Sequence, residues 1–244
     1  MATRLIRNTV VLLKSEVTYG TDPTPTGGSN AMLVSNLSIN PFNVTAVDRD
    51  LIRSYLGASE SLLGSRYVEM GFDVELTGSA TVAVAPAWGP ALLACAMAET
   101  LTAVTRADYT PVSSAFGSCT IYWYDDGLLH KATGARGAPV FKLNIDQRPV
   151  MSFKFMGLYS TPTVVSNPST TLTAWKTPQV ISEANTLDLT FGGTHSTSTA
   201  PAIASGTPYP SQGIEIDLGN KVDFNPFLGG ETVDSTSRTA TAKC

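Results

Sequence analysis

The chain has 244 residues, of which 43% are hydrophobic and 15% are charged, and its formal net charge is −4. This composition excludes a disordered chain, which needs few apolar residues and a high net charge. It also excludes a surface that binds nucleic acid through the phosphates, which needs an excess of positive charge. Abundant glycine and proline favour short strands and turns, so we expect one mainly β domain over residues 1–244.

The N-terminal region, residues 1–45, combines a short apolar run with an extended arm. The run over residues 10–13 is shorter than the roughly 7–15 residues of a signal-peptide core, so secretion is not expected. Residues 18–31 contain two prolines and three glycines. We expect this arm to be extended and poorly packed in a lone subunit.

The next segments contain one ambiguous stretch and one clear strand. Four apolar residues fall at helical spacing within residues 48–57, where a helix and an extended chain both remain open: Leu51, Ile52, Tyr55 and Leu56. Residues 66–76 alternate strictly, which predicts a strand with an apolar face and a polar face. The apolar face carries Val68, Met70, Phe72, Val74 and Leu76; the polar face carries Tyr67, Glu69, Asp73 and Glu75.

Residues 78–98 carry no charge and are long enough to span a bilayer. They are mostly alanine and other small residues, interrupted by Pro86, Gly89 and Pro90, and they lack the density of large apolar side chains that insertion requires. We predict a strand that ends near residue 85 and a short helix over residues 90–98, with Pro90 at its first position. Its apolar stripe would be Leu92, Leu93, Ala96 and Met97.

A β-meander is predicted between residues 119 and 156, within a core that we place over residues 66–160. Its four strands are expected at residues 119–124, 128–132, 141–146 and 151–156. Asp125, Asp126 and Gly127 form the first turn, residues 133–139 (TGARGAP) form a mobile loop, and residues 147–149 form the last turn. Short turns between strands predict an antiparallel sheet with one apolar and one polar face.

The C-terminal third alternates between polar connectors and short strands. Residues 161–178 form a Ser/Thr/Pro-rich connector, and residues 179–244 are expected to complete the domain. Alternation predicts one strand over residues 187–191, followed by a polar loop over residues 192–210. A last clear strand is predicted at residues 214–218.

The residues that could carry chemistry form no recognisable pattern. His130 and His195 have no partner in sequence, and Cys95, Cys119 and Cys244 have neither disulfide nor zinc spacing. The Asp125-Asp126 pair lacks the alternating ligands of a calcium loop, and a glycine-rich stretch at residues 134–137 lacks the lysine of a phosphate-binding loop. We predict no catalytic, cofactor or metal site.

Eight stretches resemble, in the same order, the major tail tube proteins of long-tailed bacteriophages. They are TYGTDPTPTGGSNAM, DRDLIRSYLGA, FDVELTGS, APAWGPALLACAMAE, YTPVSSAF, TIYWYDDGLLHKATGARG, FKFMGLYSTP and GIEIDLGNKVDF. Their collinearity over most of the chain carries the resemblance. Residues 161–178 match nothing specific in that family, and a further strand is expected where the chain reaches Cys244.

The resemblance implies a mainly β, antiparallel sandwich or barrel-like tail tube fold with one short packed helix and extended arms. It implies a structural virion protein and no enzyme, assembled in the host cytoplasm into stacked hexameric rings. The implied partners are further copies of the chain and the tape-measure, tail terminator and distal tail proteins. Double-stranded DNA would pass through the lumen without specific binding, and no membrane is involved.

Two sets of candidate site residues follow from the resemblance. Glu69, Asp73 and Glu75 lie either on an ordinary solvated face or on the wall of an acidic lumen that repels phosphates. The candidate contacts between rings are Thr18, Tyr19, Asp22, Thr133 and Arg136. The arm and the loop that carry these contact residues are expected to become ordered on stacking.

Two other classes of protein fit the same composition. A capsid decoration or baseplate protein would share the β-rich fold. A carbohydrate-binding β-sandwich would expose aromatic side chains on its polar face, for which Tyr122, Trp123 and Tyr124 are the candidates. Their alternation with Ile121 indicates that at least one side of this strand belongs to the core.

Overall fold

The computed structural model describes residues 8–79, 81, 84–102, 106–186, 188–195, 203–204 and 206–244. It is 54% strand and 2% helix with antiparallel sheets, which confirms the predicted mainly β class. The elements are β1 (Thr9–Ser15), β2 (Ala31–Met32), β3 (Val34–Asp48), β4 (Ser61–Glu75), α1 (Gly89–Leu93), β5 (Met97–Thr102), β6 (Arg106–Pro111), β7 (Cys119–Asp125), β8 (Leu128–Asn144), β9 (Val150–Tyr159), β10 (Thr163–Val164), β11 (Leu189–Phe191), β12 (Thr194–His195), β13 (Ile203–Ala204), β14 (Thr207–Tyr209), β15 (Gly213–Asp217), β16 (Asn220–Phe227), β17 (Gly230–Arg238) and β18 (Thr241–Lys243).

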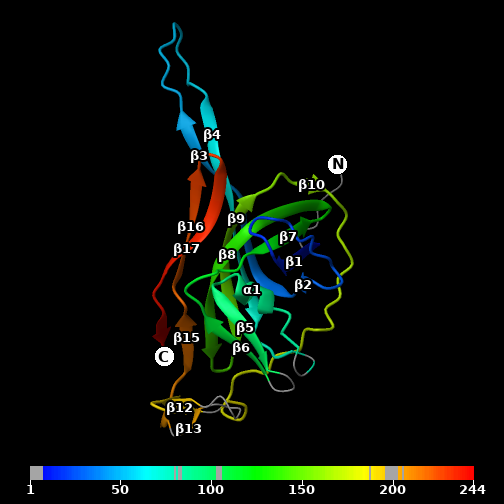
Figure 1. The fold of residues 1–244 in the computed structure, drawn as a ribbon, viewed down its shortest axis with the longest axis vertical. Helices are drawn as coiled ribbons and strands as arrows, with labels where there is room; N and C mark the ends of the chain where they lie inside the picture. The colour runs from blue at the N-terminus through cyan, green and yellow to red at the C-terminus, as the bar shows by residue number, and fades with distance from the viewer. Residues whose placement is uncertain are drawn as a thin grey trace.

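One curved antiparallel sheet organises the chain, with the strand order β2-β1-β7-β8-β9-β4-β3 (Figure 1). The long strand β8 is its spine. The first half of β8 pairs with β7, and its last five residues pair with β15 on the same edge. Strand β9 runs along the other edge of β8 and joins it to β4.

The core lies on the concave face of this sheet, where α1 packs. The alternation predicted for residues 66–76 is confirmed, because Val68, Met70, Phe72 and Val74 are all buried. The strand β9 presents Met151, Phe153 and Phe155 to the same side, since each faces one of those residues across the ladder. The ring of Phe72 lies 5.7 Å from that of Phe153 and 5.6 Å from that of Phe155.

The predicted loop at residues 133–139 is wrong, because this stretch lies inside β8. A register shift between Thr133 and Arg136 marks a β-bulge, and Gly134 supplies its positive φ of 57°. Gly134 and Gly137 leave room for aromatic rings that a larger residue would exclude. A Cβ at Gly134 would meet the Tyr19 ring at 2.8 Å, and a Cβ at Gly137 would meet the Phe155 ring at 2.7 Å.

Helix α1 begins at Gly89, one residue before the predicted start at Pro90, and it ends at Leu93 and not at residue 98. It stops because distant groups take the next carbonyl oxygens. The Gly137 N–H donates to Ala94 at 3.2 Å, and Asn220 Nδ2 donates to Cys95 at 2.7 Å. Among the described residues, no helix is long and apolar enough to cross a membrane.

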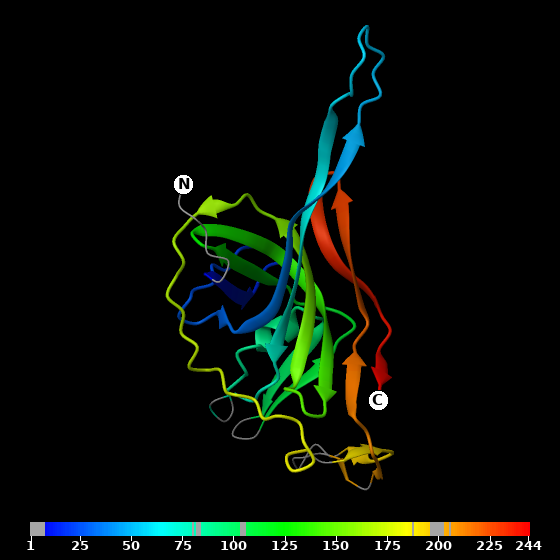
Figure 2. The ribbon, with the colours of Figure 1, turned by 180° about the vertical axis from the view of Figure 1, so that it is seen from behind.

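Strands β3 and β4 form a hairpin that projects well beyond the rest of the chain (Figures 1 and 2). Its strands pair as far as Asp48 and Ser61. We call residues 49–60, which join the two strands, the hairpin tip. The tip contains no helix, so the extended alternative for residues 48–57 is correct.

The predicted polar loop over residues 192–210 is wrong in part, because it contains the short strands β12, β13 and β14. The strand predicted at residues 214–218 forms as β15, one residue earlier at Gly213–Asp217, but β16, β17 and β18 follow, so the predicted last clear strand is not the last. Strands β16 and β17 form a separate two-stranded sheet, the C-terminal hairpin, which lies beside β4 (Figure 2). The chain bends between β15 and β16 at Gly219, whose φ is +61°.

Residues 165–181 form a strap over the body of the molecule. Its backbone N–H groups donate to carbonyl oxygens of three other regions: Val165 to Gly127 at 3.1 Å, Thr171 to Gly27 at 3.0 Å and Ile181 to Gln147 at 3.0 Å. Within the strap, the Trp175 N–H donates to Leu172 O at 3.0 Å. The indole of Trp175 also donates to Ala31 at 3.1 Å. The strand predicted at residues 187–191 is confirmed for β11, and Leu187 lies outside the described residues.

Candidate functional site

The hairpin tip gathers large apolar side chains that the chain itself does not cover. Ile52 and Leu56 are fully exposed, at 105% of the reference area each. The exposed apolar residues around them are Val47, Leu51, Tyr55, Leu62 and Leu63. An ion pair between Arg49 and Glu60 closes the base of the tip. Exposed apolar clusters of this kind mark interaction surfaces, because water would otherwise surround them.

The C-terminal hairpin also ends in apolar residues. Phe227 and Leu228 are exposed at its turn, and Gly229 provides the positive φ of 93° that the turn requires. Stacking between Tyr67 and Phe224, with ring centroids 4.9 Å apart, places this hairpin against β4. The turns of the two hairpins point toward the same end of the molecule (Figure 1), and both carry exposed apolar residues.

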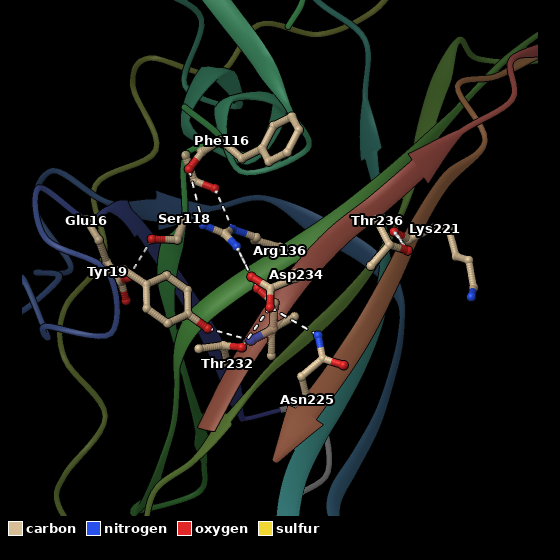
Figure 3. Close-up of polar contacts among 12 residues, drawn as sticks. Glu16, Tyr19, Phe116, Ser118, Arg136, Lys221, Asn225, Thr232, Asp234 and Thr236 are labelled. Carbon is tan, nitrogen blue, oxygen red and sulfur yellow. Dashed lines mark hydrogen bonds and ion pairs between the residues drawn. The ribbon is translucent and has the colours of Figure 1, made fainter. Parts of the chain in front are cut away.

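Arg136 holds the C-terminal hairpin on the main sheet (Figure 3). Its Nη1 donates to Val233 O at 2.8 Å and to Asp234 Oδ1 at 2.9 Å. The same guanidinium donates to the carbonyl oxygens of Phe116 and Gly117, both at 3.3 Å. One side chain thus joins β17, β8 and the segment before β7.

The N-terminal arm packs against this cluster, so the predicted poorly packed arm is wrong. The Tyr19 hydroxyl accepts the Val233 N–H at 2.6 Å, and its ring lies 4.8 Å below the Arg136 guanidinium. Glu16 is the anchor of the arm. Its carboxylate accepts hydrogen bonds from Ser118, Thr120, Gly20 N and Gly134 N, at 2.6–2.8 Å.

Asp22 anchors the arm at a second point. Its carboxylate accepts a hydrogen bond from the Tyr122 hydroxyl and one from Lys131 Nζ at 3.0 Å. Burial disfavours the carboxylate, but these donors outweigh burial and hold the pKa of Asp22 below its ordinary value. The Tyr122 hydrogen bond raises the pKa of Lys131 in turn.

The candidate contact residues Thr18, Tyr19, Asp22, Thr133 and Arg136 are therefore arranged differently from the prediction. Tyr19, Asp22 and Arg136 bind partners within the subunit, and Thr133 lies half-buried at the β8 bulge. Thr18 is exposed. Whether any of them contacts a neighbouring ring stays a prediction.

The candidate lumen residues share one face of the sheet. Glu69 is exposed, Asp73 accepts a hydrogen bond from Asn36 Nδ2 at 2.7 Å, and Glu75 is paired with Arg148 at 2.7 Å. Lys154 faces Gly71 across the ladder and so lies on the same side. The face is acidic along β4 but of mixed charge across the sheet.

The aromatic and titratable candidates are placed as follows. Tyr122, Trp123 and Tyr124 are all buried, which removes them as stacking partners for a sugar. His130 stacks on Trp123 with ring centroids 4.8 Å apart, and the side chain of His195 lies outside the described residues. The part of the chain that the structure describes contains no group of three or more His, Cys, Asp or Glu side chains placed to hold a metal.

Two surfaces escaped the sequence patterns. The apolar residues of the tip lie in residues 48–57, where the sequence pattern left a helix and an extended chain open and did not indicate an exposed surface. The run Phe227, Leu228, Gly229, Gly230 is a turn signal between two stretches able to form strands, which could have indicated the C-terminal hairpin.

Comparison with known families covers almost the whole chain. A family model described as phage tail tube protein matches residues 6–243. The match includes every strand from β1 to β18, and therefore both hairpins and the strap. No curated protein matches the chain.

Proposed function

The chain belongs to the phage tail tube protein family, and from this premise we propose that its copies form six-membered rings that stack into a tube and conduct DNA during ejection. Membership makes it a structural component of the virion tail that assembles into a multi-subunit tube. The six-fold ring, the stacking and the DNA-conducting lumen are the proposal.

The observation that carries the proposal is the projecting hairpin with its uncovered apolar tip. Each fully buried Leu or Ile side chain stabilises by about 1.5–3 kcal/mol relative to its exposed state. Ile52 and Leu56 gain none of this within a lone subunit, because both are fully exposed. A second copy that covers them would recover that free energy at every contact along a tube.

The open edge of the main sheet supports the ring. Among the described strands, β3 pairs only with β4, so its outer edge offers unpaired backbone donors and acceptors. A head-to-tail contact repeated around a closed rotation covers such an edge in every subunit.

The candidate site residues enter the proposal with distinct roles. Glu69, Asp73 and Glu75 line the lumen, where their charge keeps phosphates from binding. Thr18 contacts the adjacent ring, while Tyr19, Asp22, Thr133 and Arg136 support that contact from behind by holding the arm. The tape-measure, tail terminator and distal tail proteins bind the assembled tube, and assembly takes place in the host cytoplasm.

Negative-stain electron microscopy of the purified chain over a concentration series tests the proposal. We expect hollow tubes or stacked rings of uniform width, with the tape-measure protein added if nucleation is slow. Ile52→Asp with Leu56→Asp should abolish tubes, whereas Val164→Asp, at a largely exposed position away from the arm and the tip, should not. Monomers that persist with the tape-measure protein would favour a decoration or baseplate protein.

A further inference from the structure

The C-terminal hairpin is joined to the main sheet by side chains and not by a backbone ladder. Strands β16 and β17 pair only with each other. At the base of the hairpin, the Thr239 N–H donates to Gly219 O at 3.1 Å, and Arg238 donates to Ala96 O at 2.8 Å. Beyond this base, the position of the hairpin depends on a few side-chain contacts with the rest of the chain.

The β17 side of the hairpin is held at a single residue, Val233. Its N–H donates to the Tyr19 hydroxyl at 2.6 Å, and its carbonyl oxygen accepts from Arg136 at 2.8 Å (Figure 3). The side chain of Val233 is fully buried. On the other side, Val222 of β16 and Glu69 of the polar face line a groove of about 500 Å³, so this side leaves a recess open.

One of the two groups that hold Val233 belongs to the N-terminal arm. Tyr19 reaches the hairpin because the arm is anchored on both sides of it. Glu16 binds β7, β8 and the residue before β7, and Asp22 binds β7 and β8. Gly134 leaves the space that the Tyr19 ring occupies. The position of the hairpin is therefore tied to the position of residues 16–22.

The arm is accessible from outside between its anchors. Val17 is fully exposed, at 102% of the reference area, and Thr18 is exposed as well. Both residues lie directly between Glu16 and Tyr19 in the chain. A molecule that binds here can move Tyr19 without first touching the hairpin.

We propose that residues 16–22 are a latch for the C-terminal hairpin: when they leave the sheet, Tyr19 leaves Val233 and the hairpin lifts. In the closed state Tyr19 and Arg136 both hold β17, and in the open state Arg136 alone does. Segments 214 residues apart in the chain then respond to one contact. Both sites act on one element with two positions, which is what coupling between them requires.

The latch acts within a lone subunit, but its use in assembly rests on the proposed function. There Thr18 meets the adjacent ring, and the same contact moves the hairpin. The lifted hairpin repositions Phe227 and Leu228 at its turn and widens the recess beside Glu69. A subunit in the tube would therefore present a different surface from a free one.

Asp22→Ala tests the latch from a distance, because the partners of Asp22 lie on β7, on β8 and in the arm itself. We expect the amide hydrogens of residues 220–238 to exchange roughly 3- to 10-fold faster than in the wild type, the factor that corresponds to about one hydrogen bond. Hydrogen–deuterium exchange is measured at a concentration at which sedimentation velocity shows monomers.

Glu75→Ala is the matched control. The Glu75 side chain is 23% exposed and pairs with Arg148, much as Asp22 is 26% exposed and pairs with Lys131. Glu75 lies outside the arm, so its removal should leave the exchange of residues 220–238 unchanged. An equal rise in the control would show that any lost ion pair loosens the hairpin, and it would overturn the latch.

A second substitution decides whether the effect passes through Tyr19. In a Tyr19→Ala background the hairpin is already released, so Asp22→Ala should add nothing to the exchange rate. Tyr19→Phe keeps the ring beside Arg136 and removes only the hydroxyl, and it should by itself speed the exchange of the Val233 amide.

Three further outcomes would overturn the latch: an unchanged rate over residues 220–238 in Asp22→Ala, the same rise with and without Tyr19, or an unchanged Val233 amide in Tyr19→Phe. All these rates are measured in monomers and do not depend on tube formation. Failure of the proposed function is seen separately, as a wild type that forms no tubes in the electron microscope.

Discussion

Arg136 is the residue on which the placement of the C-terminal hairpin depends most directly. Its side chain is only 13% exposed, and its donors bind two carbonyl oxygens of the segment before β7, the Val233 carbonyl and the Asp234 carboxylate. Removing the guanidinium leaves the three carbonyl oxygens half-buried without this donor and leaves the Asp234 carboxylate without its cation, which is more costly than losing a solvent-exposed ion pair.

We expect Arg136→Met to lower the free energy of unfolding by about 2–4 kcal/mol. Arg148→Met should lower it by less than about 1 kcal/mol, because Arg148 is 47% exposed and pairs with Glu75 at the surface. Urea unfolding monitored by tryptophan fluorescence measures both. Equal losses in the two variants would show that Arg136 does not hold the hairpin.

Asp234 makes the same contact dependent on pH. Burial disfavours its carboxylate, but hydrogen bonds from Thr232 and Asn225 and the charge of Arg136 outweigh burial and lower its pKa. A lowered folded-state pKa stabilises the fold above the ordinary aspartate value of about 3.9, and this stability is lost as pH falls through the lower folded value.

We therefore expect Asp234→Asn to lower the urea midpoint at pH 6 and to have a smaller effect at pH 3. Comparison with the wild type at each pH removes the contribution of Asp22, whose pKa is lowered as well. A difference between the two proteins that is constant from pH 6 to pH 3 would contradict the assignment.

At the scale of the elements, the path of the chain from β15 to β18 depends on a single glycine, Gly219. Strands β15 and β18 pair on the main sheet, whereas β16 and β17 pair only with each other. Between them Gly219 has a φ of +61°, and a Cβ there would lie 1.9 Å from Thr239 O. The backbone at Gly219 lies too close to the backbone at Thr239 to admit any side chain at this position.

Gly219→Ala should lower the free energy of unfolding by about 2–5 kcal/mol, from backbone strain and the steric clash together. Gly229→Ala is the matched control, because its φ is +93° but a Cβ would meet nothing within 4 Å, so only the strain of about 1–2 kcal/mol applies. Thermal unfolding measures both variants. Equal losses of stability in the two variants would show that the close approach to Thr239 does not restrict the residue at position 219.

At the scale of the whole molecule, the proposed lumen places the polar face of the main sheet toward the DNA. Glu69 is exposed there, while Glu75 and Asp73 are engaged by Arg148 and Asn36. Glu69 is therefore the residue whose charge can change with the least effect on the fold.

Glu69→Lys should leave tube formation unchanged and slow DNA ejection, because a ring of lysines attracts the phosphates that a ring of carboxylates repels. The effect should shrink at high salt, where charges are screened within about 3 Å at 1 M. Asp188→Lys, at an exposed position in the β11 strand region, should leave ejection unchanged. Failure of Glu69→Lys to form tubes would instead place this face at an interface between copies.

The sequence by itself determined the mainly β class, the apolar face of β4 and the apolar face of β9. These follow from alternation with period two, in which each residue indicates its own side of the sheet. Pro90 likewise marked the start of α1 to within one residue, from local stereochemistry alone.

Only the tertiary structure decided that β8 is continuous, that α1 ends at Leu93 and that the arm is packed. Each depends on a partner far away in the chain: the Phe155 ring on Gly137, the Asn220 amide on Cys95, and Val233, 214 residues from Tyr19. A glycine that makes room for a ring has the same local signature as a glycine in a loop. Its meaning is settled by the packing of distant residues, which local pattern does not contain.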